Sequence, residues 1–442
     1  MGTVILTIAA VIEIIFGIYC FKRKSNEKKM RNIIRISTFI VFFLFILLSI
    51  IQWSFQWKPL AVILFIWSVI SVISLVRRRE CKKQYRTSRI IIKGLSMWVT
   101  IFLAVSPALI FPQYKLPETT GKYKIKAATY TFKDNNRIDT FSNTNEKREG
   151  TAEFWYPEEA TGKCPLVIFS HGAFGVKTSN TSTFNELASN GYVVCSIDHP
   201  HHSLITVNVD KKVTMVDKNF MKEVNDVNND IYDAETEYKL QQNWLKVRTD
   251  DINFIIDTIL QKVNEGNSDK VYQLIDTSKI GLIGHSLGGA ASAQVGRERN
   301  DIGAIINLDA DLLGEYIGFE NGRCRVNDKI YTVPILSIYS DDMKRLYEKI
   351  TDPDIIIPQR LILATAPNSF EVYFEGTNHM SFTDLPIVSP LLTRMISSTA
   401  KNKIGKEEAD KYYVIEKMND IALEFFDCYL KQEGSFKPED KY

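Results

Sequence analysis

The chain has 442 residues, of which 45% are hydrophobic and 24% charged, and its formal net charge is +2. This near-neutral total hides two parts of opposite charge. Residues 1–114 hold 16 Lys and Arg against 3 Asp and Glu, a net charge of +13, so the remainder holds 38 basic and 49 acidic residues, a net charge of −11. Because the larger part is acidic, bulk charge gives it no means of binding nucleic acid, and we expect no nucleic-acid partner.

Four apolar runs occupy the first 114 residues. Each is close to the roughly 20-residue length of a helix that spans a bilayer. The first run contains Glu13, which a helix in a bundle can turn away from lipid. The sequence therefore predicts a transmembrane anchor over residues 1–114, in contact with membrane lipids, with helices at about 3–21, 33–53, 59–76 and 90–111.

The loops between these runs predict the orientation of the anchor. The loops after the first and third runs are rich in Lys and Arg, whereas residues 53–58, between the second and third runs, contain a single lysine. The positive-inside rule places both basic loops in the cytoplasm. We therefore expect a multi-pass protein of the cell membrane, with everything after residue 111 on the extracytoplasmic side.

We interpret residues 115–126 as a linker and residues 127–442 as one α/β domain. Short apolar segments alternate with helical ones, which predicts a doubly wound, mostly parallel sheet. The polar stretch 203–242 is interpreted as a lid-like insertion over the active site, and residues 431–442 as a tail. The expected strands include 127–132, 150–156, 165–170, 191–197, 302–308, 335–339 and 370–374, and the expected helices include 183–190, 233–245 and 411–432.

Residues 284–288 read Gly-His-Ser-Leu-Gly, after the apolar run 280–283 and before a series of small residues. This G-x-S-x-G between a strand and a helix is typical of a nucleophile elbow, in which the serine occupies a strained turn. Glycines two positions before and after the serine let the strand and the helix approach closely. Ser286 is therefore the candidate nucleophile.

The partners of the serine follow from chain order. In hydrolases with such an elbow the acid and then the histidine follow the serine, and His379 is the only one of the six histidines that does so. Two strand ends offer the acid. Asp309 follows the apolar run 302–308, with Asp311 as a lesser candidate close by. Asp341 and Asp342 follow residues 335–339, so the residues alone leave the acid open.

An acyl-transfer enzyme also needs two backbone N–H groups aimed at the developing oxyanion. We expect one from Leu287, directly after the nucleophile. The other is expected from the turn His171-Gly172-Ala173 after residues 165–170, with Ala173 as the donor and Phe174 as second choice.

Three further histidines follow residues 191–197. His199, His201 and His202 surround a proline at a spacing that does not match known metal-ligand geometry. We expect them to support the structure or line a pocket, and we expect no metal site.

Several short segments in this order resemble the type II platelet-activating-factor acetylhydrolases, the α/β-hydrolase family of the plasma phospholipase A2 of that name. The resemblance runs from about Thr120 to Leu385, and an N-terminal membrane anchor departs from its secreted members. It implies Ser286 as nucleophile, Asp309 as acid and His379 as base, acting on lipid esters with short or oxidised acyl chains. The segments that carry it are residues 120–123, 154–157, 169–172, 198–199, 247–251, 284–289, 308–310 and 376–384.

The expected function is that of a membrane-anchored serine carboxylic ester hydrolase. His379 would take the proton of Ser286 as the serine attacks an ester carbonyl, and water would then cleave the acyl-enzyme, with no cofactor required. Two alternatives remain at this stage: an envelope acyltransferase that uses the same triad, and a non-catalytic binding domain. Hydrolase and transferase differ in the exclusion of water from the acyl-enzyme, which the sequence does not reveal.

Overall fold

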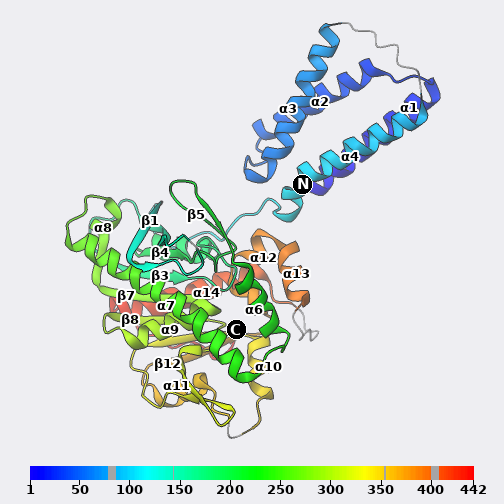
Figure 1. The fold of residues 1–442 in the computed structure, drawn as a ribbon. Coiled ribbons are helices and arrows are strands. Elements are labelled where there is room, and N and C mark those ends of the chain that lie inside the picture. The colour runs from blue at the N-terminus through cyan, green and yellow to red at the C-terminus, as the bar shows by residue number, and fades with distance from the viewer. Residues whose placement is uncertain (78–85, 143, 353–354, 400–407) are drawn as a thin grey trace. The chain divides into compact units, whose positions relative to one another are not determined.

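The computed structural model describes residues 1–77, 86–142, 144–352, 355–399 and 408–442. The chain forms two compact units (Figure 1). The helical unit comprises Met1–Lys115 and Ile387–Ile396, and the α/β unit comprises Leu116–Pro386 and Ser397–Tyr442.

Among the described residues, the helical unit contains four long helices, all apolar and long enough to cross a membrane. In Figure 1, α1 lies along α4, and α2 lies along α3. A 3-10 turn, η1, precedes α3, and the segment 387–396 contributes parts of α12 and α13. The bounds are α1 Gly2–Arg23, α2 Lys28–Leu47, η1 Phe55–Trp57, α3 Lys58–Val76, α4 Thr87–Ile110, α12 Leu385–Val388 and α13 Pro390–Thr399.

The second helix differs from its predicted position. It begins at Lys28 rather than at residue 33 and ends at Leu47 rather than at residue 53. Lys and Arg are good helix formers, so the helix extends into the basic segment, whereas Ser49 adopts a φ of 57°, which breaks the helical path. Hydropathy reports apolarity and not backbone hydrogen bonding, so it missed both ends. Most of the predicted basic loop after the third helix, residues 78–85, lies outside the described residues.

The α/β unit is built on an eight-stranded sheet in the order β1-β2-β4-β3-β7-β8-β11-β12. The pairs β1–β2 and β2–β4 are antiparallel, and all later pairs are parallel. The predicted mostly parallel α/β fold is thus confirmed. The strands are β1 Ile125–Ile138, β2 Lys147–Pro157, β3 Cys164–Ser170, β4 Val193–Asp198, β7 Ile275–His285, β8 Ile302–Leu308, β11 Ile335–Ser340 and β12 Ser369–Phe374.

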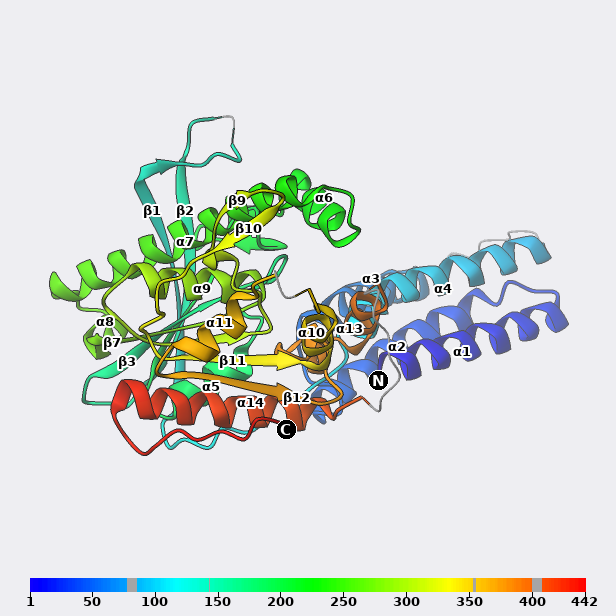
Figure 2. The same cartoon turned by 90° about the horizontal axis from the view of Figure 1, so that it is seen from below.

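Helices cover both faces of this sheet, as Figure 2 shows. One face packs on α7 (Ala234–Asn264) and α9 (Leu287–Glu298), and the other on α5 (Thr181–Ser189) and α14 (Lys411–Phe426). The apolar face predicted for the final helix is buried as expected. Smaller elements complete the unit: α8 Lys270–Leu274, η2 Leu313–Glu315, β9 Tyr316–Glu320, β10 Arg323–Val326, α10 Asp341–Lys349, α11 Pro358–Thr365, η3 His379–Phe382 and η4 Asp427–Lys431.

Two terminal segments of this unit are more ordered than expected. In the predicted linker, the Gly121 and Tyr123 amides donate to the side chain and carbonyl of Ser189, which fastens this stretch to α5. At the other end, the prediction that residues 431–442 form a tail is wrong. Tyr442 exchanges backbone hydrogen bonds with Tyr373 and Glu375, so the last residues pair with the edge of β12, a contact between distant segments that composition does not reveal.

The insertion 203–242 forms a small hairpin and a helix before α7. The hairpin consists of β5 (Ile205–Val207) and β6 (Val213–Met215), and the helix is α6 (Lys218–Asn228). Val216 and Phe220 are buried in the core of the unit, whereas Val213 and Met215 are exposed. The insertion is therefore packed through a few residues and leaves part of its apolar surface open.

Candidate active site

Ser286 occupies a sharp turn between β7 and α9. Its backbone has φ 53° and ψ −130°, a strained conformation for a residue other than glycine. The turn needs the flanking glycines, because a Cβ on Gly284 would lie 2.3 Å from the Gly288 carbonyl oxygen, and a Cβ on Gly288 would lie 2.0 Å from that of Ser170. The amide of Ser286 donates to the Leu308 carbonyl at 2.9 Å, which ties the turn to β8. This is the geometry of a nucleophile elbow.

Asp309 and His379 form a hydrogen-bonded pair beside this turn. Nδ1 of His379 lies 2.7 Å from Oδ2 of Asp309. The Asp309 side chain is 1% exposed, and that of His379 is 43% exposed, so the carboxylate is fixed and the imidazole is open on one side. Ser340 holds the carboxylate in place through its amide, at 2.6 Å, and its hydroxyl, at 3.0 Å.

The loop of His379 is also tied to the elbow. Nε2 of His285 lies 2.8 Å from the His379 carbonyl oxygen, and the two rings are 4.6 Å apart. Since His285 directly precedes Ser286, this contact keeps the His379 loop next to the turn. Burial and the neighbouring His379 lower the pKa of His285 to about 3, so its neutral ring is a hydrogen-bond donor here.

The other candidate acids have different partners. Asp341 accepts a hydrogen bond from the Gly376 amide at 2.8 Å and pairs with Arg345. Asp311 accepts from the Tyr347 hydroxyl at 2.6 Å, and burial raises the pKa of its carboxyl. Burial likewise raises the pKa of Asp342. Of the four carboxylates considered, Asp309 is the one that the structure brings into contact with His379.

Electrostatics at the pair favour a positively charged imidazole. Burial by itself lowers the pKa of His379, but the hydrogen bond and negative charge of Asp309 outweigh it, and Asp311 and Asp342 add in the same direction. The pKa of His379 is therefore raised above its usual 6.5. A base with such a pKa accepts a proton readily at neutral pH.

Two backbone amides near Ser286 suit an oxyanion. Leu287 is the first residue of α9, so its N–H points out of the helix end. Gly172 lies against the elbow, because a Cβ there would be 3.0 Å from Cβ of Ser286, and Ala173 follows it. Phe174, our second choice, donates to the His202 carbonyl at 3.0 Å. Within the described chain the Ala173 and Leu287 amides have no hydrogen-bond acceptor.

A fully buried arginine holds the turn that carries Ala173. Arg248 of α7 donates to the carbonyls of His171, at 2.7 Å, and Gly172, at 3.2 Å, and lies 3.2 Å from Nδ1 of His202. Burial lowers the pKa of this guanidinium to about 9. Arg248 thus fixes the backbone from which Ala173 projects.

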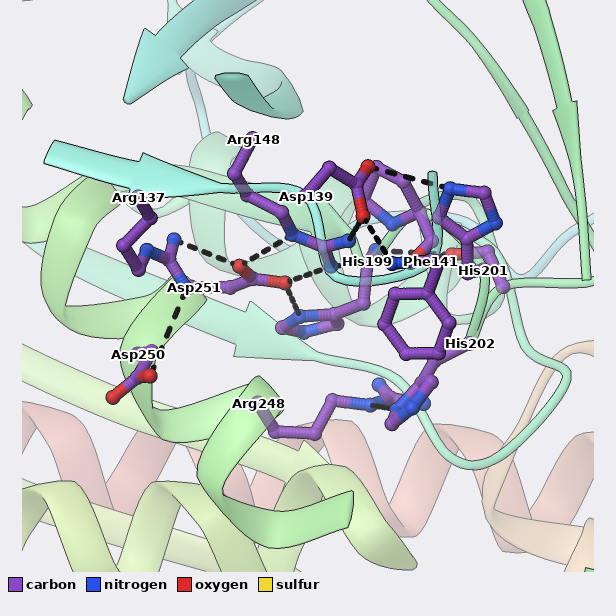
Figure 3. Close-up of polar contacts among 12 residues, drawn as sticks. Arg137, Asp139, Phe141, Arg148, His199, His201, His202, Arg248, Asp250 and Asp251 are labelled. Atoms are coloured by element: carbon purple, nitrogen blue, oxygen red, sulfur yellow. Dashed lines mark hydrogen bonds and ion pairs between the residues drawn. The ribbon is translucent and has the colours of Figure 1, made fainter. Parts of the chain in front are cut away.

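The histidine cluster belongs to a buried charge network shown in Figure 3. Asp251 lies at its centre and accepts from Arg148 at 2.7 Å, Arg137 at 2.9 Å and His199 at 3.1 Å. Burial by itself would raise the pKa of Asp251, but Arg148 and His199 hold it well below its usual value. His201 pairs with Asp139 at 3.3 Å. These contacts give the cluster the structural role expected from the sequence.

Sequence reasoning missed three residues of the site. Ser340, His285 and Arg248 support the acid, the base loop and the oxyanion turn, respectively. Ser340 directly follows the predicted strand 335–339, and Arg248 lies in the segment 247–251 that carries the family resemblance. The sequence therefore indicated where both residues lie but not what they do. Their roles depend on contacts between distant parts of the chain.

A mostly parallel eight-stranded sheet, with a serine at a strand-to-helix elbow and an Asp–His pair after later strands, defines an α/β-hydrolase. Within that class, the family model described as "Platelet-activating factor acetylhydrolase, isoform II" matches residues 152–441. The chain belongs to this family, which confirms the resemblance inferred from the sequence.

Individual relatives are distant. The platelet-activating factor acetylhydrolase of Bos taurus is 23% identical over 308 residues, covering 66% of this chain and 63% of the relative. That of Gallus gallus is 25% identical over 299 residues, covering 63% and 65%. A putative phospholipase A2 of Schizosaccharomyces pombe is 22% identical over 321 residues, covering 62% and 69%. The chain thus spans slightly less than two thirds of the animal relatives.

A solved structure shares the fold. The ferulic acid esterase from Streptomyces cinnamoneus superposes with a TM-score of 0.54 and 17% sequence identity, over 73% of this chain and 96% of that one. At this identity the similarity concerns the fold alone.

Proposed function

We propose that this protein is a membrane-anchored serine ester hydrolase that acts on lipid or other acyl esters. Ser286 is the nucleophile, His379 the general base and Asp309 the acid that orients the histidine. The observation that carries this proposal is the 2.7 Å hydrogen bond between Asp309 and His379 next to the strained turn of Ser286. Family membership supports the reaction class.

The reaction uses these groups in order. Asp309 holds the proton on Nδ1 of His379, so Nε2 is free to take the proton of Ser286 as the serine oxygen attacks the ester carbonyl. The N–H groups of Ala173 and Leu287 stabilise the resulting oxyanion. His379 then protonates the leaving alcohol, and water hydrolyses the acyl-enzyme in a second round of the same proton transfers.

The relatives suggest the substrate class. Several are named as acetylhydrolases of platelet-activating factor and one as a putative phospholipase A2. We therefore propose a phospholipid ester with a short acyl group as the substrate. The four apolar helices would hold the enzyme at the membrane, and the basic loops favour an extracytoplasmic α/β unit. A topology reporter fused after Tyr114 tests on which side of the membrane the α/β unit lies. A cytoplasmic signal would contradict the extracytoplasmic placement.

The activity test uses the full-length protein purified in detergent. Hydrolysis of nitrophenyl esters of increasing acyl length is compared among the wild type, Ser286→Ala and His379→Ala, with His201→Ala as a control that also removes one imidazole. We expect both site variants to lose turnover, the control to retain it, and short esters to be preferred. Equal turnover in all four proteins would contradict the esterase proposal. Acyl transfer to an added alcohol without release of acid would favour a transferase.

A further inference from the structure

The helical unit contains a basic cavity, which is lined by Asn26, by Arg77 and by side chains of α2, α3 and α4. Its volume is about 770 Å³. The lining carries no carboxylate among the described residues, and its positive side chains are Lys28, Arg31, Arg35, Arg77, Arg89 and Lys93. Such a concentration of one sign of charge within a helical bundle favours an anionic occupant.

Two arginines of α2, Arg31 and Arg35, lie near one buried carboxylate, that of Glu13. Glu13 of α1 is 3.2 Å from Nη1 of Arg31, and both side chains are largely buried, at 9% and 11% exposure. Arg31 thus has a carboxylate partner. Arg35, one helical turn further along α2, has no carboxylate in hydrogen-bond contact among the described residues.

The surroundings of Arg35 are poor substitutes for an anion. Its Nη2 lies 3.6 Å from the sulfur of Met97, and its guanidinium lies 5.3 Å from the centre of the Trp67 ring. Its Nε is buried and, within the described chain, has no hydrogen-bond partner. An unsatisfied charged group in an apolar bundle is strongly unfavourable. Among the described residues Arg35 therefore has no hydrogen-bonded anion, because Glu13, which lines the same apolar cavity, is hydrogen-bonded to Arg31 instead.

A second cavity indicates what kind of anion fits. An apolar cavity of about 170 Å³ lies among the four helices and shares Arg35, Trp67 and Met97 with the basic cavity. Its other lining residues are aliphatic or aromatic except Thr38 and Glu13, and Glu13 is hydrogen-bonded to Arg31. A ligand that occupies both cavities would need a negatively charged group at one end, for the basic cavity, and a hydrocarbon chain at the other, for the apolar cavity.

We propose that the helical unit binds one anionic phospholipid, with its phosphate in the basic cavity and part of an acyl chain in the apolar one. Guanidinium groups match phosphate oxygens in geometry and charge. Basic pockets between transmembrane helices suit such headgroups. The inference presupposes that the four helices lie in a membrane, as proposed above, but it does not depend on the esterase reaction.

The test measures lipid binding by the full-length protein in detergent. Native mass spectrometry compares retention of phosphatidylglycerol with that of phosphatidylcholine, for the wild type, Arg35→Gln and Lys29→Gln. The last variant is the matched control, because Lys29 is an exposed lysine of the same helix and does not line either cavity. We expect selective retention of phosphatidylglycerol, about tenfold weaker in Arg35→Gln, as for loss of a charge-assisted hydrogen bond, and unchanged in the control.

Three outcomes would overturn the proposal. They are equal retention of the two lipids, equal retention by the wild type and Arg35→Gln, and equal weakening by Lys29→Gln, which would indicate bulk charge alone. Glycerol 3-phosphate is tested in the same assay to distinguish a lipid from a soluble phosphate ester. If it binds as tightly as phosphatidylglycerol, the site is one for a soluble phosphate ester. If Arg35→Gln does not fold, Arg89→Gln gives the same comparison. Ester hydrolysis, measured in parallel, distinguishes failure of this proposal from failure of the esterase.

Discussion

Replacement of Asp309 by asparagine tests which carboxylate orients the base. In the wild type, Oδ1 of Asp309 accepts the Ser340 amide, while Oδ2 accepts from the Ser340 hydroxyl and from Nδ1 of His379. The asparagine carbonyl would keep the bond to the Ser340 amide. Its NH₂ group would then face His379 and donate to Nδ1, so the imidazole proton would move to Nε2, where it blocks removal of the serine proton.

The expected loss follows from this tautomer change. The equivalent substitution in a serine-protease triad lowers kcat about 10⁴-fold, which corresponds to about 5.4 kcal/mol of activation free energy. We expect a loss of roughly 10³- to 10⁴-fold in kcat for nitrophenyl ester hydrolysis by Asp309→Asn, with KM nearly unchanged. The fold should be retained, because the shape and one anchoring bond are preserved, and the circular dichroism spectrum checks this.

Asp341→Asn is the matched control. Asp341 accepts from the Gly376 amide and pairs with Arg345, and an asparagine carbonyl keeps the first of these contacts. We expect less than a roughly tenfold loss, since one charged contact is weakened. A large loss in Asp341→Asn together with near-normal turnover in Asp309→Asn would refute the assignment and identify Asp341 as the acid.

Three further predictions follow from the same unit. Asp251→Asn removes the carboxylate that buried Arg148 shares with half-buried Arg137, so thermal unfolding should show a loss of about 3–5 kcal/mol, or roughly 5–10 °C. The raised pKa of His379 keeps the base protonated to higher pH, so kcat/KM should fall with decreasing pH around a midpoint above 6.5; a midpoint below that value would contradict the Asp309 contact. Gly288→Ala should yield unfolded or inactive protein, because its Cβ would clash with the Ser170 carbonyl, whereas Gly162→Ala, with open space, should not.

Local patterns predicted much of the α/β unit. The short apolar strands and the glycines around Ser286 can be recognised from a few neighbouring residues. The sheet and the nucleophile elbow were therefore predicted correctly. Local patterns could not identify the acid of the triad, because Asp309 and Asp341 both follow apolar strands. Which one meets His379 depends on how the ends of β8, β11 and β12 are arranged in three dimensions.

Contacts between distant segments account for what the sequence did not reveal. Arg248 donates hydrogen bonds to the carbonyls of Gly172 and His171, which lie 76 and 77 positions away in the sequence. The pairing of Tyr442 with the edge of β12 is equally non-local. In the helical unit, hydropathy found four apolar runs, and Arg35 lies within the second of them. Only the packing of α2 shows that, in the part of the chain that the structure describes, no carboxylate is hydrogen-bonded to Arg35.

Covalent labelling tests the central claim most directly. A fluorophosphonate reacts with an activated serine, and peptide mass spectrometry of the labelled full-length protein locates the adduct. We predict one adduct, on the peptide that contains Ser286, absent from Ser286→Ala and formed much more slowly in His379→Ala. Ester hydrolysis that persists with no adduct at Ser286, or with the adduct on another serine, would contradict the proposed role of Ser286.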